Sequence, residues 1–230
     1  MQDSCEPRPR HELKHSINHA DYLMLRARLR AALRQDRHAG PEGRYRVSSL
    51  YFDTPTDTAL RDKINGVDGR EKFRIRRYND DFGFIQIEKK SKQRGLCTKR
   101  KEAIGLEELR QLLNGDRSWM MSEQRPLALE FASKMTTQGL RPTVIVEYVR
   151  EAFTHPAGNV RITLDSNLHT SRYATDFLSA ATPLLPLGDK DLLLEVKYDA
   201  FIPEIITGLL GIPSRRAHAF SKYAASRIYC

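Results

Sequence analysis

Several segments of this chain alternate between apolar and charged residues with a period of two. The clearest are residues 72–76 (KFRIR), 85–90 (IQIEKK) and 193–197 (LLEVK). Because successive side chains of a β-strand point to opposite faces, each segment has one apolar face and one face lined with cations and a few carboxylates. A glutamate followed two residues later by a lysine recurs at Glu12/Lys14, Glu88/Lys90 and Glu195/Lys197. This repetition indicates strands that surround an anionic ligand and retain carboxylates to hold a metal ion.

Turn and helix signals divide the rest of the chain into short strands and helices. Strands are expected at residues 10–17, 44–52, 70–78, 82–90, 97–104, 141–153, 160–169 and 191–198. Asn18 or Asp21 can cap a helix after the first strand, and further helices are expected at residues 57–64, 106–113, 122–138, 203–210 and 219–228. Residues 171–188 show little periodicity. The pattern predicts a single α+β domain, residues 1–230, in which an eight-stranded antiparallel sheet forms a β-barrel with helices packed outside.

The composition is that of a basic globular protein. A net charge of +9 and an isoelectric point near 9.6 indicate an anionic partner, such as a nucleotide, polyphosphate, nucleic acid or anionic membrane. Cys5, Cys97 and Cys230 are far apart, which argues against a disulfide framework or a zinc site and favours a reducing, cytoplasmic location. No apolar stretch approaches the about 20 residues of a membrane span, and the first residues do not resemble a signal peptide.

Cationic side chains on the predicted strands form the candidate phosphate site. Arg74 and Arg76 share one strand face, and arginine suits bidentate contacts with phosphate. For this strand alone, the two arginines are better explained as the solvent-exposed face of a hairpin. Cations that can lie on the inward faces of other strands change this balance: they are Lys90, Lys99, Arg150, Arg161 and Lys197. Several cationic strands in one sheet predict a binding site for a polyanion.

The carboxylates on these strands are candidate metal ligands. Glu12, Glu88 and Glu195 each lie on the same side of a strand as a lysine, and each could form only a surface ion pair worth about 0–1 kcal/mol. In a cavity that holds phosphate, however, hard oxygen ligands are what Mg²⁺ or Mn²⁺ requires. Glu195 is the strongest candidate because apolar residues bury its strand. Glu147 ranks lower because it lies on the face opposite Arg150.

Residues 220–223 (FSKY) form a third candidate element. A serine near the start of a short helix ordinarily caps it, but Ser221 and Lys222 at a helix start could also bind phosphate. The nucleotide-binding motifs GxxxxGKS/T and GxGxxG are absent, and no Ser/His/Asp or Cys/His nucleophile stands out. A phosphate site in this chain therefore depends mainly on the strands.

Seven short motifs occur in a distinctive order: RHELKH (10–15), SLYFDT (49–54), KFRIRRY (72–78), EKK (88–90), RITLD (161–165), LEVKY (194–198) and FSKY (220–223). In this order they resemble the VTC domain, the catalytic domain of the vacuolar transporter chaperone polyphosphate polymerase and its bacterial relatives. The resemblance extends from about residue 8 to residue 229. Through this domain the chain resembles the wider CYTH or triphosphate tunnel metalloenzyme group.

The resemblance implies an eight-stranded tunnel with basic walls that bind triphosphate or polyphosphate, and Mn²⁺ or Mg²⁺ held by glutamate. The positions that match phosphate contacts are Lys14, Arg74, Arg76, Lys90, Arg150, Ser221 and Lys222. Glu195 matches the metal ligand, and Lys99 lies where the family has a further tunnel lysine. Tunnel hydrolases of the wider group carry ExExK in the first strand. Arg10 replaces the first glutamate here, which favours the polymerase branch.

The resemblance further implies a metal-dependent phosphotransferase that moves the γ-phosphate of ATP to a growing inorganic polyphosphate chain. The residues expected to act in catalysis are Arg74, Arg76, Lys90, Arg150 and Lys222. Two alternatives stay open: a phosphohydrolase acting on tri- or polyphosphate or nucleoside triphosphate, and a module that binds polyphosphate or nucleic acid without turnover. ATP and polyphosphate are the expected partners and nucleic acid is not. A membrane protein at the cytoplasmic face could receive the product.

Overall fold

The computed structural model describes residues 10–94, 96–179, 184–188, 192–211 and 220–228. Its long strands are all antiparallel to their neighbours: β1 (His11–Ile17), β3 (Tyr45–Asp53), β4 (Arg70–Tyr78), β5 (Asp81–Gln93), β6 (Leu96–Ile104), β7 (Arg141–His155), β8 (Val160–Ser171) and β10 (Leu192–Tyr198). Two short strands extend the sheet, with β2 (Arg34–Gln35) paired to β7 and β9 (Leu185–Pro186) paired to β8.

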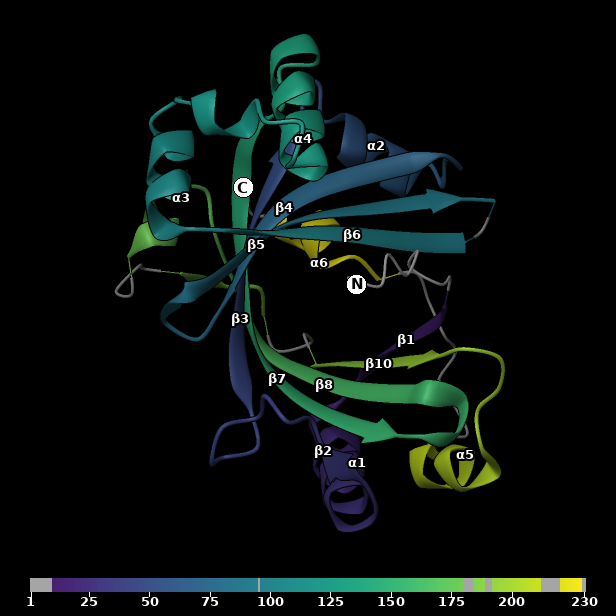
Figure 1. The fold of residues 1–230 in the computed structure, drawn as a ribbon. Helices are drawn as coiled ribbons and strands as arrows, with labels where there is room; N and C mark the ends of the chain where they lie inside the picture. Colours follow the sequence, from purple (N-terminus) through teal and green to yellow (C-terminus); the bar gives the residue numbers. More distant parts are fainter. Residues whose placement is uncertain (1–9, 95, 180–183, 189–191, 212–219, 229–230) are drawn as a thin grey trace.

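The sheet runs in the order β1-β10-β8-β7-β3-β4-β5-β6. It curls, so that an upper half (β4, β5 and β6) lies over a lower half (β8, β10 and β1), and β3 and β7 connect the two (Figure 1). Within the described chain, β1 and β6 are edge strands that do not pair with each other. The predicted antiparallel α+β fold of eight long strands is confirmed. Over the described strands the sheet is a half-barrel that backbone hydrogen bonds do not close into a ring.

Helices cover the outside of both halves (Figure 1). The helices are α1 (His19–Ala32) and α5 (Glu204–Leu210) at the lower half, α3 (Leu106–Leu113) and α4 (Pro126–Thr137) at the upper half, α2 (Thr58–Ile64) beside β4, and α6 (Lys222–Ser226) between the halves. Among the described residues, no helix combines the length and the apolar character needed to cross a lipid bilayer.

The apolar face of each strand packs against these outer helices. Phe52 and Phe73 contact Phe131 of α4, with ring centroids 4.8 and 4.9 Å apart. On the lower half, Leu25 and Leu29 of α1 are completely buried in a second core. Each such leucine stabilises the fold by about 1.5–3 kcal/mol. Because the apolar positions face outward under the helices, the alternating charged positions face the inside of the curl.

Local signals account for where the helices begin. Asn18 caps α1: its side-chain oxygen accepts a hydrogen bond from the backbone N–H of Asp21 at 2.8 Å, as predicted. α4 begins later than predicted, at Pro126, because proline suits the first position of a helix and disrupts its interior. Residues 171–188 contain only the 3₁₀ turn η3 (Ala174–Leu178) and β9 in their described part. Residues 180–183 and 212–219, which include the start of the last predicted helix, lie outside the described residues.

Candidate functional site

The charged strand faces converge on the inner surface of the curled sheet. On the upper half, Arg74 lies opposite Glu88 and Lys72 lies opposite Lys90 in the register of β4 and β5. Lys90 extends to the lower half, where its Nζ lies 2.8 Å from Oε2 of Glu12 on β1. Since β1 is the far edge of the sheet, charged residues from both halves line one common space, which we call the lumen.

Glu88 organises the upper wall of the lumen. The residue is 1% exposed, and its Oε2 accepts a hydrogen bond from Arg74 Nε at 2.7 Å. Arg76 Nη1 lies 3.8 Å from the same oxygen, and Lys99 pairs with Oε1. Burial alone would raise the pKa of Glu88, but the charges of Arg74, Arg76 and Lys99 hold this pKa far below its usual range. Glu88 is therefore a fixed negative charge that orients three cations.

Glu12 and Glu195, on the paired strands β1 and β10, form a second centre. Lys14 Nζ lies 3.6 Å from Oε1 of both glutamates, and Lys197 Nζ lies 3.7 Å from Glu12 Oε1 and 3.5 Å from Glu195 Oε1. Burial alone would raise the pKa of Glu195, but the positive charges of Lys197, Lys14 and Arg150 hold it well below its usual range. The distances exceed those of good hydrogen bonds, so the lysines neutralise these two oxygens without saturating them.

Asp165 is a third, completely buried carboxylate. Arg150 donates two parallel hydrogen bonds to it at 2.7 and 2.8 Å, and Lys222 Nζ lies 2.6 Å from its Oδ2. Lys222 Nζ also lies 4.6 Å from the ring centre of Tyr148, whose hydroxyl accepts a hydrogen bond from Arg76 at 3.3 Å. These contacts connect α6 to the arginines of the upper wall, so the charged clusters form one continuous site.

Tyr51 of β3 is a titratable group within this site. Its hydroxyl accepts a hydrogen bond from Arg74 at 2.9 Å, and Lys72 Nζ lies 5.9 Å from its ring centre. Although burial opposes ionisation, the charges of Arg74 and Lys72 lower the pKa of Tyr51 to about 7. Burial and the neighbouring Lys90 lower the pKa of Lys72 to about 8. Two lumen groups therefore change charge close to neutral pH.

α6 is held beside the lumen by its own side chains. Tyr223 donates a hydrogen bond to Asp53 at 2.5 Å, and Arg227 donates two hydrogen bonds to Asp57 at 2.8 and 3.0 Å. Ser221 Oγ caps the helix by accepting a backbone hydrogen bond at 3.4 Å. Ser221 therefore has the helix-capping role that is ordinary for a serine at the start of a helix. Fixing the helix in this way also fixes the position of Lys222.

Most of the predicted site residues lie together in the lumen. The connected set comprises Lys14, Arg74, Arg76, Lys90, Lys99, Arg150, Lys197 and Lys222, with Glu12, Glu88 and Glu195. Arg161 is tied to Tyr45 by a hydrogen bond of 3.0 Å and pairs with Asp36. The roles of all these residues toward phosphate or metal stay predictions.

Four further lumen residues, Lys72, Asp165, Tyr51 and Tyr148, were not predicted as site residues. Asp165 shares a strand face with Arg161, and Tyr148 shares one with Arg150, so the period of two could have found both. Tyr51 lies in the SLYFDT motif but has an apolar body, which is typical of a core residue. The structure shows that these tyrosines are both core residues and hydrogen-bond acceptors for arginine.

Glu12 and Glu195 fit a divalent cation better than Glu88 does. Both oxygens of Glu88 are engaged by Arg74 and Lys99, whereas the facing Oε1 atoms of Glu12 and Glu195 have only lysines at 3.5–3.7 Å. Mg²⁺ is commonly held by one or two carboxylates, with water and phosphate oxygens completing its shell. Among the described residues, no group of three or more His, Cys, Asp or Glu side chains could hold a metal ion. The three predicted ligands therefore do not form a single all-protein site.

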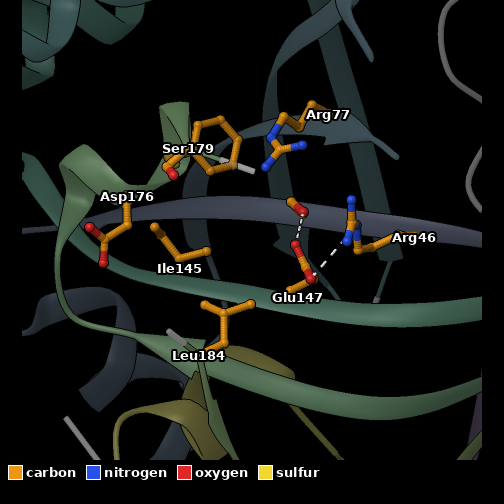
Figure 2. Close-up of a pocket in the computed structure, with 9 residues that line it drawn as sticks. Arg46, Arg77, Ile145, Glu147, Asp176, Ser179 and Leu184 are labelled. Carbon is orange, nitrogen blue, oxygen red and sulfur yellow. Dashed lines mark hydrogen bonds and ion pairs between the residues drawn. The ribbon is translucent and has the colours of Figure 1, made fainter. Parts of the chain in front are cut away.

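The opposite face of the sheet has a small cavity of about 120 Å³ (Figure 2). Glu147 lines it, accepts a hydrogen bond from Ser48 at 2.5 Å and lies 3.7 Å from Arg46 Nε. Arg77 and Asp176 also line this cavity, so positive and negative side chains are both present. Glu147 lies outside the lumen, on the face opposite Arg150 as its position in the strand predicts.

Solved structures share the fold at low sequence identity. A crystal structure described as a "putative adenylate cyclase" from Bacillus halodurans is 16% identical, with 89% of this chain and 87% of that chain covered and a TM-score of 0.52. The PH1819 protein from Pyrococcus horikoshii OT3 is 14% identical, with 96% and 99% covered and a TM-score of 0.50. At this level of identity these similarities show the fold alone, an antiparallel α+β sheet of the same architecture.

The family model of the VTC domain matches residues 9–229. The chain therefore belongs to the VTC domain family, as its seven motifs predicted. No curated protein matches the chain significantly.

Proposed function

We propose that this protein is a polyphosphate polymerase that transfers the γ-phosphate of ATP to the end of an inorganic polyphosphate chain. The proposal rests on one observation: contacts run without a break from Lys99 and Arg74 to Arg150 and Lys222, and they join the charged side chains of the lumen into one surface. Cations outnumber carboxylates along this surface, which suits a ligand with many adjacent negative charges. Membership of the VTC domain family supports the same reaction.

Phosphoryl transfer needs positioning and charge stabilisation more than it needs a protein nucleophile. Arg74 and Arg76 would bind the oxygens of the transferred phosphoryl group, because guanidinium groups form bidentate contacts with phosphate. Arg150 and Lys222 would hold a neighbouring phosphate, and Lys90, which lies on the upper half with Arg74 and Arg76, would neutralise further phosphate charge. A terminal oxygen of the chain would attack the γ-phosphorus as the bond to the bridging oxygen breaks, and ADP would leave.

The remaining predicted contacts would extend this binding surface to further phosphates. They are Lys14, Lys99, Arg161, Lys197 and Ser221. Glu195 and Glu12 would hold Mn²⁺ or Mg²⁺ between the protein and the phosphates. When bound, such a cation neutralises phosphate oxygens as a Lewis acid. Lys14 and Lys197, which now neutralise the two glutamates, would then be free to contact phosphate.

Incubation of the purified protein with ATP and Mn²⁺, followed by sizing of the products on a gel, tests the proposal. We expect ADP and polyphosphate of growing length. Arg74→Ala should lower the rate by about 100-fold or more, as for loss of one electrostatic contact in a transition state. Arg110→Ala is the matched control, because Arg110 lies on α3 in an exposed ion pair with Glu107.

Other products would contradict the polymerase. Free phosphate without chain growth would support the tunnel phosphohydrolase instead. Binding of polyphosphate with neither ADP nor free phosphate released would support a non-catalytic binding module.

A further inference from the structure

A second basic cavity lies where α2 meets the ends of β4 and β5. We call it the vestibule and define it by Lys63 of α2, Arg70 of β4 and Lys92 of β5. Its volume is about 410 Å³, and Ser221 at the start of α6 lines it as well. The vestibule therefore adjoins the same helix that carries Lys222 into the lumen.

The register of β4 and β5 makes the vestibule a continuation of the lumen wall. Arg70 pairs across the strands with Lys92, and the next pair on the same face is Lys72 with Lys90. Two like-charged pairs in succession destabilise a hairpin. Lys90 is paired with Glu12, and one step further into the lumen Arg74 pairs with Glu88, so neutralisation by carboxylates begins at Lys90 and does not include Arg70 or Lys92. The end of the hairpin is therefore an uncompensated extension of the basic wall.

The vestibule cations lack acidic partners of the kind found in the lumen. Arg70 donates a hydrogen bond to the backbone oxygen of Val67 at 2.6 Å, and no described carboxylate forms an ion pair with Lys63, Arg70 or Lys92. Burial lowers the pKa of Lys63, and the charges of Arg70, Lys14 and Lys92 lower it further. A protein that keeps like charges together in this way loses stability unless an anion compensates them.

We propose that the vestibule binds additional phosphate units of a polyphosphate chain whose end lies in the lumen. This proposal rests on the proposed function and adds a substrate property to it: selectivity for long chains. A short anion such as tripolyphosphate fills the lumen without extending to Lys63. A long chain contacts Lys63, Arg70 and Lys92 as well and is held by these extra ion pairs.

The test compares two probes, inorganic tripolyphosphate and long-chain inorganic polyphosphate, by calorimetry at fixed salt. In the double variant Lys63→Ala/Lys92→Ala, we expect long-chain affinity to fall by about 10-fold or more, while tripolyphosphate affinity changes by less than about 2-fold. The slope of log affinity against log salt for the long chain should decrease in magnitude by about 1.4, the value for two lost contacts with a single-stranded polyanion. Lys63→Glu alone should give the same selective loss.

The matched control is Arg44→Ala/Arg110→Ala, which removes two exposed cations outside both cavities. Its affinity for both probes should match that of the unsubstituted protein. Equal losses for the two probes in Lys63→Ala/Lys92→Ala, or no loss for either, would overturn the vestibule proposal. Failure of the proposed function is distinguishable, because it shows in the assay with ATP and Mn²⁺ as the absence of ADP and of chain growth, whereas the vestibule proposal is decided by the two affinities.

Discussion

The Nζ atom of Lys90 on β5 lies 2.8 Å from Oε2 of Glu12 on β1. These strands lie near opposite ends of the sheet order, and the described edge strands share no backbone hydrogen bonds. Side chains, not the backbone, therefore hold the two walls of the lumen together at this point. An anion that binds Lys90, or a cation that binds Glu12, competes with this contact. Binding of a ligand in the lumen and loss of the contact between Lys90 and Glu12 are consequently coupled.

The Lys90→Met substitution keeps the alkyl stem of Lys90 and removes its charge. Both partners are partly exposed, so we expect the free energy of unfolding to fall by only about 0–1 kcal/mol. Tripolyphosphate affinity should fall by about 10-fold or more, because a hydrogen bond to a charged group contributes about 1.5–3 kcal/mol. Urea unfolding and calorimetry measure the two effects. A variant with much lower stability and unchanged affinity would show that Lys90 stabilises the fold and does not contact the ligand.

Removing the charge of Asp165 should lower the free energy of unfolding strongly, in contrast to Lys90→Met. Asp165→Asn leaves Arg150 and Lys222 without their buried counter-ion, which typically costs about 3–5 kcal/mol of folding free energy. Tripolyphosphate can replace the missing negative charge, so it should raise the melting temperature of Asp165→Asn more than that of the unsubstituted protein.

The control for this prediction is Glu42→Gln, which breaks the exposed pair of Glu42 with Arg44. Its free energy of unfolding should change by less than about 1 kcal/mol, with or without tripolyphosphate. If added tripolyphosphate stabilises Asp165→Asn no more than the unsubstituted protein, then Arg150 and Lys222 do not contact the ligand.

The strands and their charged faces could be predicted from local pattern. Residues 70–78 were predicted as a strand and form β4 with the same bounds. Once that segment is a strand, the period of two places Arg74 and Arg76 on one face and Phe73 and Ile75 on the other. The burial of Phe73 and Ile75 under α4 then leaves the arginines only the inner face. The alternation of the two faces needs no tertiary information, whereas the burial under α4 does.

The pairing of charges across the lumen could not be predicted in the same way. Glu88 and Glu195 both precede a lysine by two positions, yet their partners differ. Glu88 is held by Arg74 and Lys99, while Glu195 has only longer contacts, of 3.5–3.6 Å, with Lys14, Lys197 and Arg150. The register of neighbouring strands and the curl of the sheet decide these partners. Neither the register nor the curl can be read from a local run of residues. The same spacing of glutamate and lysine therefore has different ion-pair partners on β5 and on β10.

The lumen should bind polyphosphate less tightly as the pH rises. Tyr51 gains a negative charge as the pH passes its lowered pKa of about 7, and Lys72 loses its positive charge as the pH passes about 8. Both changes reduce the positive charge of the lumen, so affinity falls with rising pH and is greatest where Tyr51 is neutral and Lys72 is protonated. By linkage, a bound polyanion raises both pKa values.

The Tyr51→Phe substitution tests the first of these two steps. Its tripolyphosphate affinity, measured by calorimetry at several pH values, should lose the decrease near pH 7 and keep the one at higher pH. The ligand's own titration is common to both proteins and cancels in the comparison. Identical pH profiles for Tyr51→Phe and the unsubstituted protein would show that Tyr51 stays protonated over this range.

The metal assignment predicts different results for two of the lumen glutamates, Glu195 and Glu88, and for Glu147 on the opposite face of the sheet. Manganese binding in the presence of tripolyphosphate, followed through the spectrum of free Mn²⁺, should weaken by at least about 10-fold in Glu195→Gln. Glu147→Gln should bind as the unsubstituted protein does, because Glu147 lies on the opposite face of the sheet. Glu88→Gln should lose stability, since it leaves Arg74 and Arg76 without their counter-ion, but keep its manganese affinity. If Glu88→Gln loses manganese and Glu195→Gln keeps it, the cation binds at the upper wall and the assignment to Glu12 and Glu195 is wrong.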